Sequence, residues 1–315
     1  MWTAPAIPSV GPVIVLDGLT KRYGEKAAVA DLTLEIEPGR VTGFLGPNGA
    51  GKSTTMRLIT GLDAPTSGSA LIGGRPYAAL RHPLREVGAL LEARSAHPGR
   101  TARSHLLGIA RSDGIPARRV DAVLELVGLT SVARKRVGSF SLGMRQRLGI
   151  AAALLGDPGV LLLDEPVNGL DPDGVRWIRE LIRSLAAEGR TVLLSSHLMS
   201  EMQDTADHLV VIGRGRLIAD APIGEVLGGS SRNAVLVRSP KASELRERLT
   251  HAGMTVESPG EGEILVTGGS LDDIGELAFR HGVPLYELSA RRATLEQAYM
   301  ELTAASVEYG EREAK

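Results

Sequence analysis

The sequence predicts an α/β fold with a largely parallel sheet, followed by a smaller α+β module. Apolar segments of strand length alternate with helical segments from residue 13 to about residue 228, a pattern typical of a parallel sheet covered by helices. A strand, a glycine-rich turn and a helix follow one another within residues 40–62. After residue 229 the order changes to strand, helix, strand, strand, helix, strand, which indicates a second module.

The chain is expected to begin with a disordered lead-in at residues 1–12. This stretch has three prolines but neither a basic start nor an apolar core, so we do not expect a signal peptide. The stretches VIVLDGL (13–19) and DLTLEIE (31–37) then cluster or alternate apolar residues as strands do.

A helical subdomain is expected at about residues 93–157, inside an α/β domain that spans residues 13–228. Apolar residues recur three and four apart within residues 101–135, and another helix follows Ser141. The segment GVLLLDEP (159–166) then predicts a short buried strand that ends in carboxylates.

An amphipathic helix and a further buried strand continue the alternation. Residues 175–189 place their apolar side chains on one helical face, and TVLLSSH (191–197) reads as another buried strand. The apolar face of the helix consists of Val175, Ile178, Leu181, Ile182 and Leu185.

The carboxy-terminal module is expected at residues 232–305, with the element order of a ferredoxin-like fold. Its second helix begins with a capping pair, Ser270 and Asp273. The expected elements are a strand at 234–238, a helix at 241–251, two strands within 254–268, a helix at 271–281 and a strand at 283–289.

A last helix and a short tail complete the chain. The stretch TLEQAYMELTA is expected to bury Leu295, Tyr299 and Leu302, and the tail at 306–315 is expected to fray. This module contains no evident repeat or catalytic motif, so the chemistry is expected in the first domain.

Composition excludes several classes of protein. Hydrophobic residues make up 43% of the 315 residues and aromatic residues 3%, so the core must be mostly aliphatic. The formal net charge of −1 provides no field that would attract nucleic acid. Cysteine is absent, which excludes disulfides and thiolate metal sites. The apolar runs are shorter than the roughly 20 residues of a spanning helix, so we do not expect the chain to cross a membrane.

The strongest functional motif is GPNGAGKST, which fits G-x-x-x-x-G-K-[ST] between a strand and a helix. Its glycines let backbone N–H groups turn inward, and the following helix adds its positive end, so the motif predicts a nest for the phosphates of ATP. Lys52 can then reach the β- and γ-phosphates, and Ser53 can bind Mg²⁺. The candidate residues of this loop are Gly46, Pro47, Asn48, Gly49, Ala50, Gly51, Lys52, Ser53 and Thr54.

Two buried strands end in further candidate residues. Asp164 lies at the carboxyl end of its strand, where open α/β sheets bind ligands, and is predicted to support Mg²⁺. Glu165 is predicted to act as general base or to position a water in line with the γ-phosphate. His197 is a candidate for a hydrogen bond to that phosphate. A solvated acidic turn and a satisfied polar histidine are the structural alternatives.

The stretch SFSLGMRQRLG (139–149) contains a second helix start suited to an anion. The Ser141 hydroxyl, the Gly143 N–H and the helix N-terminus together form an anion site without a cation. Gly143 also lets the backbone approach a phosphate closely. A simple capped helix is the alternative, because a cap needs only Ser141.

Five motifs resemble, in order and approximate spacing, those of the ATPase subunit of an ABC transporter. They are GPNGAGKST, SLGMRQR, LLLDEP, NGLDP and SSH, and the resemblance covers about residues 13–225. In that family a signature, usually Leu-Ser-Gly-Gly-Gln, binds the γ-phosphate of an ATP held by another subunit. Ser141 and Gly143 match it, whereas Leu142 replaces its first glycine and Met144 its glutamine. The resemblance therefore implies two subunits, most simply a homodimer, that close head to tail around two ATP molecules.

The resemblance also implies roles for three other residues. Tyr23 matches the aromatic residue that stacks on adenine, and Asp171 matches the aspartate at the dimer seam that couples the two sites. Glu92 takes the lid position, usually glutamine, from which it can reach Mg²⁺ or water while adding negative charge near the γ-phosphate. The structural alternatives are a lone surface tyrosine, a turn aspartate before Pro172 and a solvated acidic loop.

The resemblance favours a transport ATPase that energises a separate multi-span permease from the cytoplasmic face of the membrane. The compact insert, the ALLEA lid and the ATLEQAYMELT ending look like those of drug- and antibiotic-export subunits of the daunorubicin/bacitracin type. An importer subunit would use the same ATPase chemistry and stays open as an alternative. A soluble ABC ATPase acting on nucleic acid or ribosomes is disfavoured by the single cassette, the lack of cysteine and the near-zero charge. A regulator that binds without hydrolysing is disfavoured by Glu165 and His197.

Overall fold

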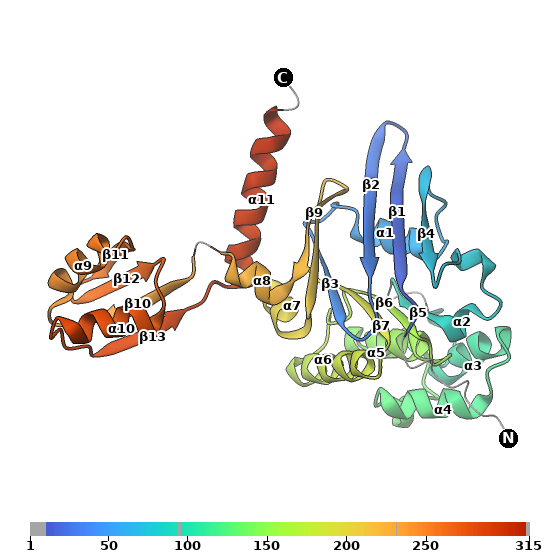
Figure 1. Cartoon of the computed structure of the whole chain (residues 1–315). Coiled ribbons are helices and arrows are strands. Elements are labelled where there is room, and N and C mark those ends of the chain that lie inside the picture. Colours follow the sequence, from blue (N-terminus) through green and yellow to red (C-terminus); the bar gives the residue numbers. More distant parts are fainter. Residues whose placement is uncertain (1–10, 93–95, 231, 313–315) are drawn as a thin grey trace. The chain divides into compact units, whose positions relative to one another are not determined.

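The computed structural model describes residues 11–92, 96–230 and 232–312 (Figure 1). Contacts along the chain separate two units, Met1–Ala221 and Pro222–Lys315. The first unit is built on a mostly parallel sheet and the second on an antiparallel sheet with helices. This architecture confirms the fold class that the sequence predicts.

A six-stranded sheet forms the centre of the first unit. Its order is β5-β6-β7-β3-β8-β9, and the pairs from β5 to β8 are parallel. Parallel pairing brings the carboxyl ends of neighbouring strands to one edge; Asp164 pairs with Ser195, which in turn pairs with Phe44. The strands are β3 (Val41–Leu45), β5 (Val87–Leu90), β6 (Val160–Asp164), β7 (Thr191–Ser195), β8 (His208–Gly213) and β9 (Arg216–Pro222).

A smaller antiparallel sheet packs on the first through an aliphatic core. Ile14 and Ile36 from this sheet join Phe44 of β3 and Met56 of helix α1 (Lys52–Ile59) in one buried cluster. The α1 helix is thereby held between the two sheets, which fixes the start of the helix at the carboxyl edge of β3. The sheet has the order β2-β1-β4, with β1 at Ile14–Tyr23, β2 at Lys26–Ile36 and β4 at Ser67–Ile72.

Residues 11 and 12 are ordered, contrary to the expected disordered lead-in. The Gly11 N–H donates to the Gly189 carbonyl at 2.7 Å, and the Thr191 hydroxyl donates to the Pro12 carbonyl at 2.8 Å. These two hydrogen bonds tie the segment to the parallel sheet. The rest of the expected lead-in, residues 1–10, lies outside the described residues.

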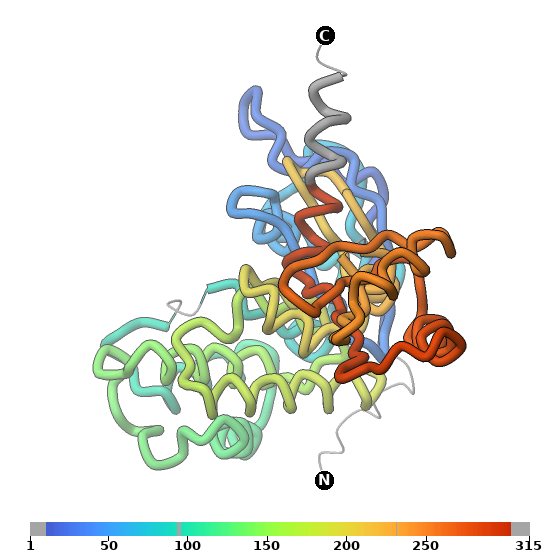
Figure 2. The backbone as a smooth tube through the Cα atoms, turned by 90° about the vertical axis from the view of Figure 1, so that its left-hand side faces the viewer, coloured from blue at the N-terminus to red at the C-terminus, as the bar shows by residue number. Residues whose placement is uncertain are grey.

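Three helices occupy the position of the expected helical subdomain: α3 (Ala102–Ser112), α4 (Ala117–Leu126) and α5 (Leu142–Ala153). Leu106, Val123 and Leu148 are buried among them. The three helices are grouped together, away from the β2-β1-β4 sheet, in both views (Figure 1 and Figure 2). The first residues of the expected range, 93–95, lie outside the described chain.

Helix α6 (Pro172–Ala187) begins three residues earlier than predicted, and β7 ends two residues earlier, at Ser195. Asp171 accepts a backbone N–H as the N-cap of α6, and Pro172 sits where a missing N–H costs nothing. On the predicted apolar face Ile178, Ile182 and Leu185 are buried, whereas Val175 and Leu181 are half-buried. Two short helices complete the unit, α2 (Pro83–Glu86) and α7 (Met199–Thr205).

The second unit begins with α8 (Ile223–Gly228) and has a four-stranded antiparallel sheet in the order β11-β12-β10-β13. The division between the units thus falls before α8, whereas the sequence places it after residue 228. The order of elements is the predicted ferredoxin-like one, and Ser270 and Asp273 form the predicted capping box. The elements are β10 (Ala234–Arg238), α9 (Ala242–His251), β11 (Thr255–Gly260), β12 (Glu263–Thr267), α10 (Leu271–Arg280) and β13 (Glu287–Arg291).

The last strand of this unit was predicted at 283–289 and lies at β13 instead. The Val283 N–H donates to the Ala278 carbonyl and closes the end of α10, while Pro284 has no N–H for a sheet ladder. Val283 is nevertheless buried in the core of the unit. Its apolar character therefore reflects burial in a connection rather than in a strand.

The last helix, α11 (Leu295–Arg312), runs into the expected tail. Leu295 is buried, but Tyr299 and Leu302 are only half-buried. Alanine and glutamate in residues 301–312 favour continued helix, and the final three residues lie outside the described chain. Neither α11 nor any other helix of the described chain is long and apolar enough to span a bilayer.

Candidate active site

The phosphate loop connects the carboxyl end of β3 to the start of α1. Gly49 and Gly51 have φ angles of 81° and 111°, which side chains with a Cβ rarely adopt. A Cβ at Gly51 would also lie 2.5 Å from the Ala28 carbonyl oxygen. Gly51 is the N-cap of α1 and offers no side chain to the first N–H groups of the helix. These groups are therefore open to an anionic ligand.

Lys52 is buried inside this loop. Its Nζ donates to the Gly46 carbonyl at 2.5 Å and to the Pro47 carbonyl at 3.3 Å. Burial lowers the pKa of Lys52, and the nearby carboxylates of Glu165 and Asp164 partly oppose that shift. The ammonium group is thus placed near the loop and two acids, where it can also form a charged hydrogen bond with a phosphate.

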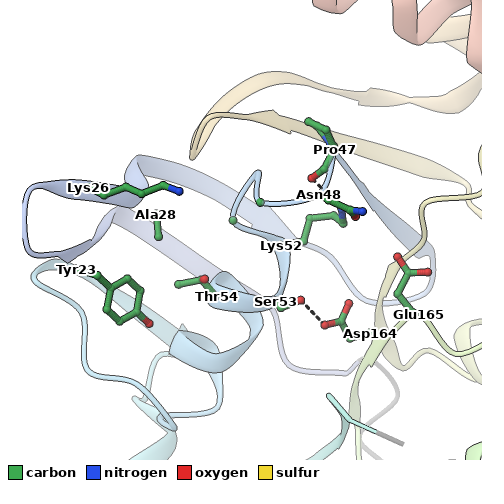
Figure 3. A pocket seen from close by; sticks show the side chains of 12 residues that line it. Tyr23, Lys26, Ala28, Pro47, Asn48, Lys52, Ser53, Thr54, Asp164 and Glu165 are labelled. Carbon is green, nitrogen blue, oxygen red and sulfur yellow. Dashed lines mark hydrogen bonds between the residues drawn. The ribbon is translucent and has the colours of Figure 1, made fainter.

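An open pocket of about 390 Å³ lies over the loop (Figure 3). Gly46 and Ala50 are buried and support the loop from behind. Lys26 and Ala28 belong to the lining although the sequence did not single them out; they lie two residues apart on β2 and so share one strand face. The lining consists of Tyr23, Lys26, Ala28, Pro47, Asn48, Gly49, Gly51, Lys52, Ser53, Thr54, Asp164 and Glu165.

Asp164 faces the first turn of α1. The Ser53 hydroxyl donates to Asp164 Oδ2 at 2.5 Å (Figure 3). The Ser195 hydroxyl donates to the other oxygen, Oδ1. Ser53 and Asp164 supply hard oxygen donors, which suit Mg²⁺ when phosphate and water complete the coordination. Among the described residues no group of three or more histidines, cysteines and acids is arranged to hold a metal ion.

Glu165 has an unusual backbone. Its φ of 52° lies in the left-handed region, which is uncommon for a residue other than glycine. Its N–H donates to the Ser195 carbonyl at 3.2 Å, and its Oε2 lies 2.7 Å from His197 Nδ1. Its carbonyl accepts a hydrogen bond from Gln146 Nε2 at 3.0 Å. The structure thus brings together Glu165 and His197, two residues that the sequence selected from separate motifs.

Tyr23 is held at the rim of the pocket by charged neighbours. Its hydroxyl donates to Asp63 Oδ2 at 3.0 Å, and Asp63 pairs with Arg57 at 2.7 Å. Lys21 Nζ lies 5.1 Å from the ring centroid, within cation–π range. Partial desolvation and the bond to Asp63 raise the pKa of the Tyr23 hydroxyl. The ring is about half exposed, so part of its surface can still stack on a base.

The signature residues lie outside this pocket. Ser141 caps α5 by accepting the Met144 N–H at 3.2 Å, so the cap that the structural alternative requires is present. A Cβ at Gly143 would lie 2.8 Å from the Gly169 carbonyl oxygen, which gives this glycine a packing role within the chain. The Ser141 side chain is exposed and Met144 is half-buried.

Two other predicted residues also lie away from the pocket lining. Asp171 accepts the Gly174 N–H at 2.9 Å as the cap of α6. Glu92 is exposed two residues beyond β5 and directly precedes residues 93–95, which lie outside the described chain. Neither residue is among those that line the pocket.

Gln146 and Ser195 are site residues that the sequence analysis missed. Ser195 was available as the first serine of the SSH motif, directly before the edge of the sheet. Gln146 gave no such signal, because its burial, at 2% exposed, is visible only in the folded chain. A buried amide usually has a specific hydrogen-bond partner.

Known proteins resemble this chain over both units. The ABC transporter family matches residues 29–168, and a domain of unknown function (DUF8746) matches residues 233–296. The bacitracin transport ATP-binding protein BcrA of Bacillus licheniformis is 45% identical over 213 residues, 67% of this chain and 70% of that protein. The Nod factor export ATP-binding protein I of Ralstonia nicotianae is 34% identical over 313 residues, 96% of this chain and 98% of that protein. A solved ATP-binding subunit of an ABC transporter has a TM-score of 0.62 at 25% identity, covering 84% of this chain and 99% of that one.

Proposed function

Because this chain belongs to the ABC transporter family as an ATP-binding and ATP-hydrolysing subunit, we propose that two copies close around two ATP molecules and drive export through a separate permease. The observation that carries the proposal is the convergence of Lys52, Asp164 and Glu165 on one pocket at the carboxyl edge of the sheet. A cation, a metal-supporting acid and a candidate base at that edge are the parts that phosphoryl transfer to water requires.

Each of these residues has a distinct role in the proposal. The phosphate loop and Lys52 bind and orient the β- and γ-phosphates, replacing the carbonyl partners that Lys52 now has. Tyr23 stacks on adenine at the rim. Glu165 orients the attacking water or accepts its proton, and His197 keeps the Glu165 carboxylate in position.

Ser53 and Asp164 would hold Mg²⁺, together with phosphate oxygens and water. When bound, the ion would neutralise charge on the β- and γ-phosphates. The hydrogen bond from Ser53 to Asp164 supports this assignment, because it already places the hydroxyl and carboxylate oxygens side by side. Glu92 is proposed to approach the same region when the lid closes.

The site is proposed to be completed by a second copy of the chain. Ser141 is exposed at the N-terminus of the 12-residue helix α5, where its hydroxyl and the first N–H groups can meet an anion. Ser141, Gly143 and Met144 carry no charge, so this site would bind an anion through hydroxyl and N–H groups, whereas the phosphate loop uses the ammonium group of Lys52. Asp171, at the start of α6, is proposed to lie at the seam between the subunits.

Export is proposed from the relatives. The names of two of them describe bacitracin transport and Nod factor export, which favours a drug, antibiotic or other hydrophobic compound as cargo. A membrane-spanning partner is required, and the subunit is proposed to sit on the cytoplasmic face of the membrane through that partner.

The test is to isolate the full-length Glu165→Gln variant from membranes in the presence of ATP and to identify what remains bound. A multi-span membrane protein should co-purify with the variant in a fixed ratio. Vesicles that contain this membrane protein and the wild-type ATPase subunit should export a drug or antibiotic when ATP is supplied. Recovery with ribosomes or nucleic acid, and without a membrane protein, would contradict the proposal. ATP-driven inward transport would overturn only its direction.

A further inference from the structure

One buried side chain connects the signature helix to the candidate base. Gln146 lies two residues beyond Met144 on α5 and is 2% exposed. Its Nε2 donates to the main-chain carbonyl of Glu165 at 3.0 Å. Ser141 is the exposed N-cap of α5, and the second turn of the same helix contacts the main chain of Glu165 through Gln146.

The main chain of Glu165 needs such support. A residue other than glycine in the left-handed region is strained and persists only where its surroundings fix it. On one side, the Glu165 N–H donates to Ser195 of the neighbouring strand. On the other side, the carbonyl accepts from the Asn168 N–H at 3.2 Å and from Gln146. Of these contacts, the one from Gln146 comes from outside the sheet and its following turn.

We propose that Gln146 is a positioning residue whose hydrogen bond fixes the backbone of Glu165. Through this bond the position of the Glu165 carboxylate depends on the position of α5. The inference rests on the proposed roles of Glu165 and Ser141. When Ser141 engages the ATP of the other subunit, α5 is held in place, and Gln146 then secures Glu165 for hydrolysis in its own site. The buried amide of Gln146 thereby contributes to the coupling between the two sites of the dimer.

The neighbouring residue keeps the helix anchored if this amide is removed. Arg147 Nη1 donates to the Val127 carbonyl at 3.1 Å, and its guanidinium carbon lies 4.5 Å from the centroid of the Trp177 ring. These contacts tie α5 to α4 and α6 independently of Gln146. Methionine has a similar length and volume to glutamine but no donor, so Gln146→Met removes the hydrogen bond with little change in packing.

The experiment measures ATP hydrolysis by the purified full-length chain. Gln146→Met should lower kcat about 10- to 100-fold, while the KM for ATP stays within about threefold because ground-state binding is unchanged. Gln146→Glu, which places a carboxylate against the Glu165 carbonyl, should lower kcat at least as much as Gln146→Met does. Gln297→Met, the same change at an exposed residue of α11, serves as the matched control and should keep wild-type rates.

A double-variant cycle separates positioning from general damage. In a Glu165→Gln background Gln146→Met should cause no further loss, because there is no carboxylate left to position. A wild-type kcat for both Gln146 variants, or equal losses with and without Glu165, would overturn the inference while leaving the proposed function intact. Normal turnover by Glu165→Gln would instead overturn the role of Glu165 and the inference together. If Gln146→Met folds poorly, Gln146→Glu decides the question by the same cycle.

Discussion

The imidazole of His197 is paired with the carboxylate of Glu165, with Nδ1 2.7 Å from Oε2. The pair joins the ends of two neighbouring parallel strands, β6 and β7, at the edge where the phosphate loop also lies. A histidine bound in this way can keep the carboxylate oriented and leave its Nε2 for a phosphate. The two residues are therefore expected to act as a unit.

Replacing Glu165 should reduce the rate of ATP hydrolysis more than replacing His197 does. Glu165→Gln should reduce turnover about 100-fold or more, the usual contribution of a general base, and should accumulate an ATP-bound dimer on a sizing column. His197→Ala should reduce kcat roughly 10-fold, because the carboxylate remains but is less well oriented. The double variant should be no slower than Glu165→Gln alone. Fully additive losses in steady-state assays would show that the two side chains act separately.

Replacement of Lys52 should separate ligand binding from folding. Burial lowers the pKa of Lys52, so the folded protein disfavours its charge, and Lys52→Met should leave the Tm of the ligand-free protein unchanged or higher. ATP at 100 times its Kd should stabilise the wild type by about 2.7 kcal/mol, or roughly 5–10 °C in Tm. The variant should lose this shift. A normal ATP-induced shift in Lys52→Met would refute the assignment of the phosphate loop.

The same pKa shift predicts a dependence on pH. Between the lowered pKa of the folded chain and the ordinary value of 10.5, the unfolded chain binds more protons at Lys52 than the folded chain does. Stability from this group therefore rises with pH in that window. The difference in Tm between Lys52→Met and the wild type should shrink as the pH rises toward 10.5, and a widening difference in thermal scans would contradict the assigned cause.

Asp171 caps α6 in the structure and is proposed to couple the two ATP sites, and two substitutions can distinguish these roles. Asp171→Ala removes the cap of α6 and should destabilise the first unit by about 1 kcal/mol. Asp171→Ser keeps a capping oxygen but removes the carboxylate, so its stability should be close to wild type while cooperativity in ATP hydrolysis falls. Denaturant titration and the Hill coefficient measure the two effects. Wild-type cooperativity in Asp171→Ser would leave Asp171 as a cap and nothing more.

Glu92 tests the effect of charge at the lid. A carboxylate near the γ-phosphate should oppose closure by about 1 kcal/mol, so Glu92→Gln should raise ATP affinity or the hydrolysis rate of the isolated subunit roughly fivefold. Nucleotide titration and phosphate release measure the two quantities. If neither changes, the negative lid has no role in closure.

Local patterns in the sequence predicted much of the fold and part of the site. The phosphate loop, the Ser141 cap and the Ser270–Asp273 capping box all depend on residues that are close in sequence, so short motifs were enough. The apolar strands β6 and β7 were recognisable because a parallel sheet is covered on both faces. Asp164 and Glu165 could be placed at the same edge as the loop because parallel strands end there together.

Contacts between distant segments could not be read from the sequence. The bonds from Gln146 to Glu165 and from Ser195 to Asp164 join residues 19 and 31 positions apart, and no local pattern specifies them. Val283 was misplaced for a related reason: its apolar side chain fills a core from a connection, which periodicity cannot distinguish from a strand. Gly143 was selected for phosphate binding, yet its close approach to Gly169 is visible only in the folded chain.

The central claim is that the signature of one subunit lies against the phosphate loop of the other, and chemical cross-linking tests it most directly. The chain has no cysteine, so Asn48→Cys and Leu142→Cys, each in the Glu165→Gln background, carry one thiol apiece. Asn48 lines the pocket, and Leu142 is exposed beside Ser141.

Treating a mixture of these two variants with a short bismaleimide should give a product of twice the 33.2 kDa chain mass on a denaturing gel. The product should form only with ATP and only when both variants are present. Equal cross-linking without ATP, or within either variant alone, would contradict the composite site. The absence of the cross-linked product from a mixture that elutes as an ATP-bound dimer would also contradict the composite site.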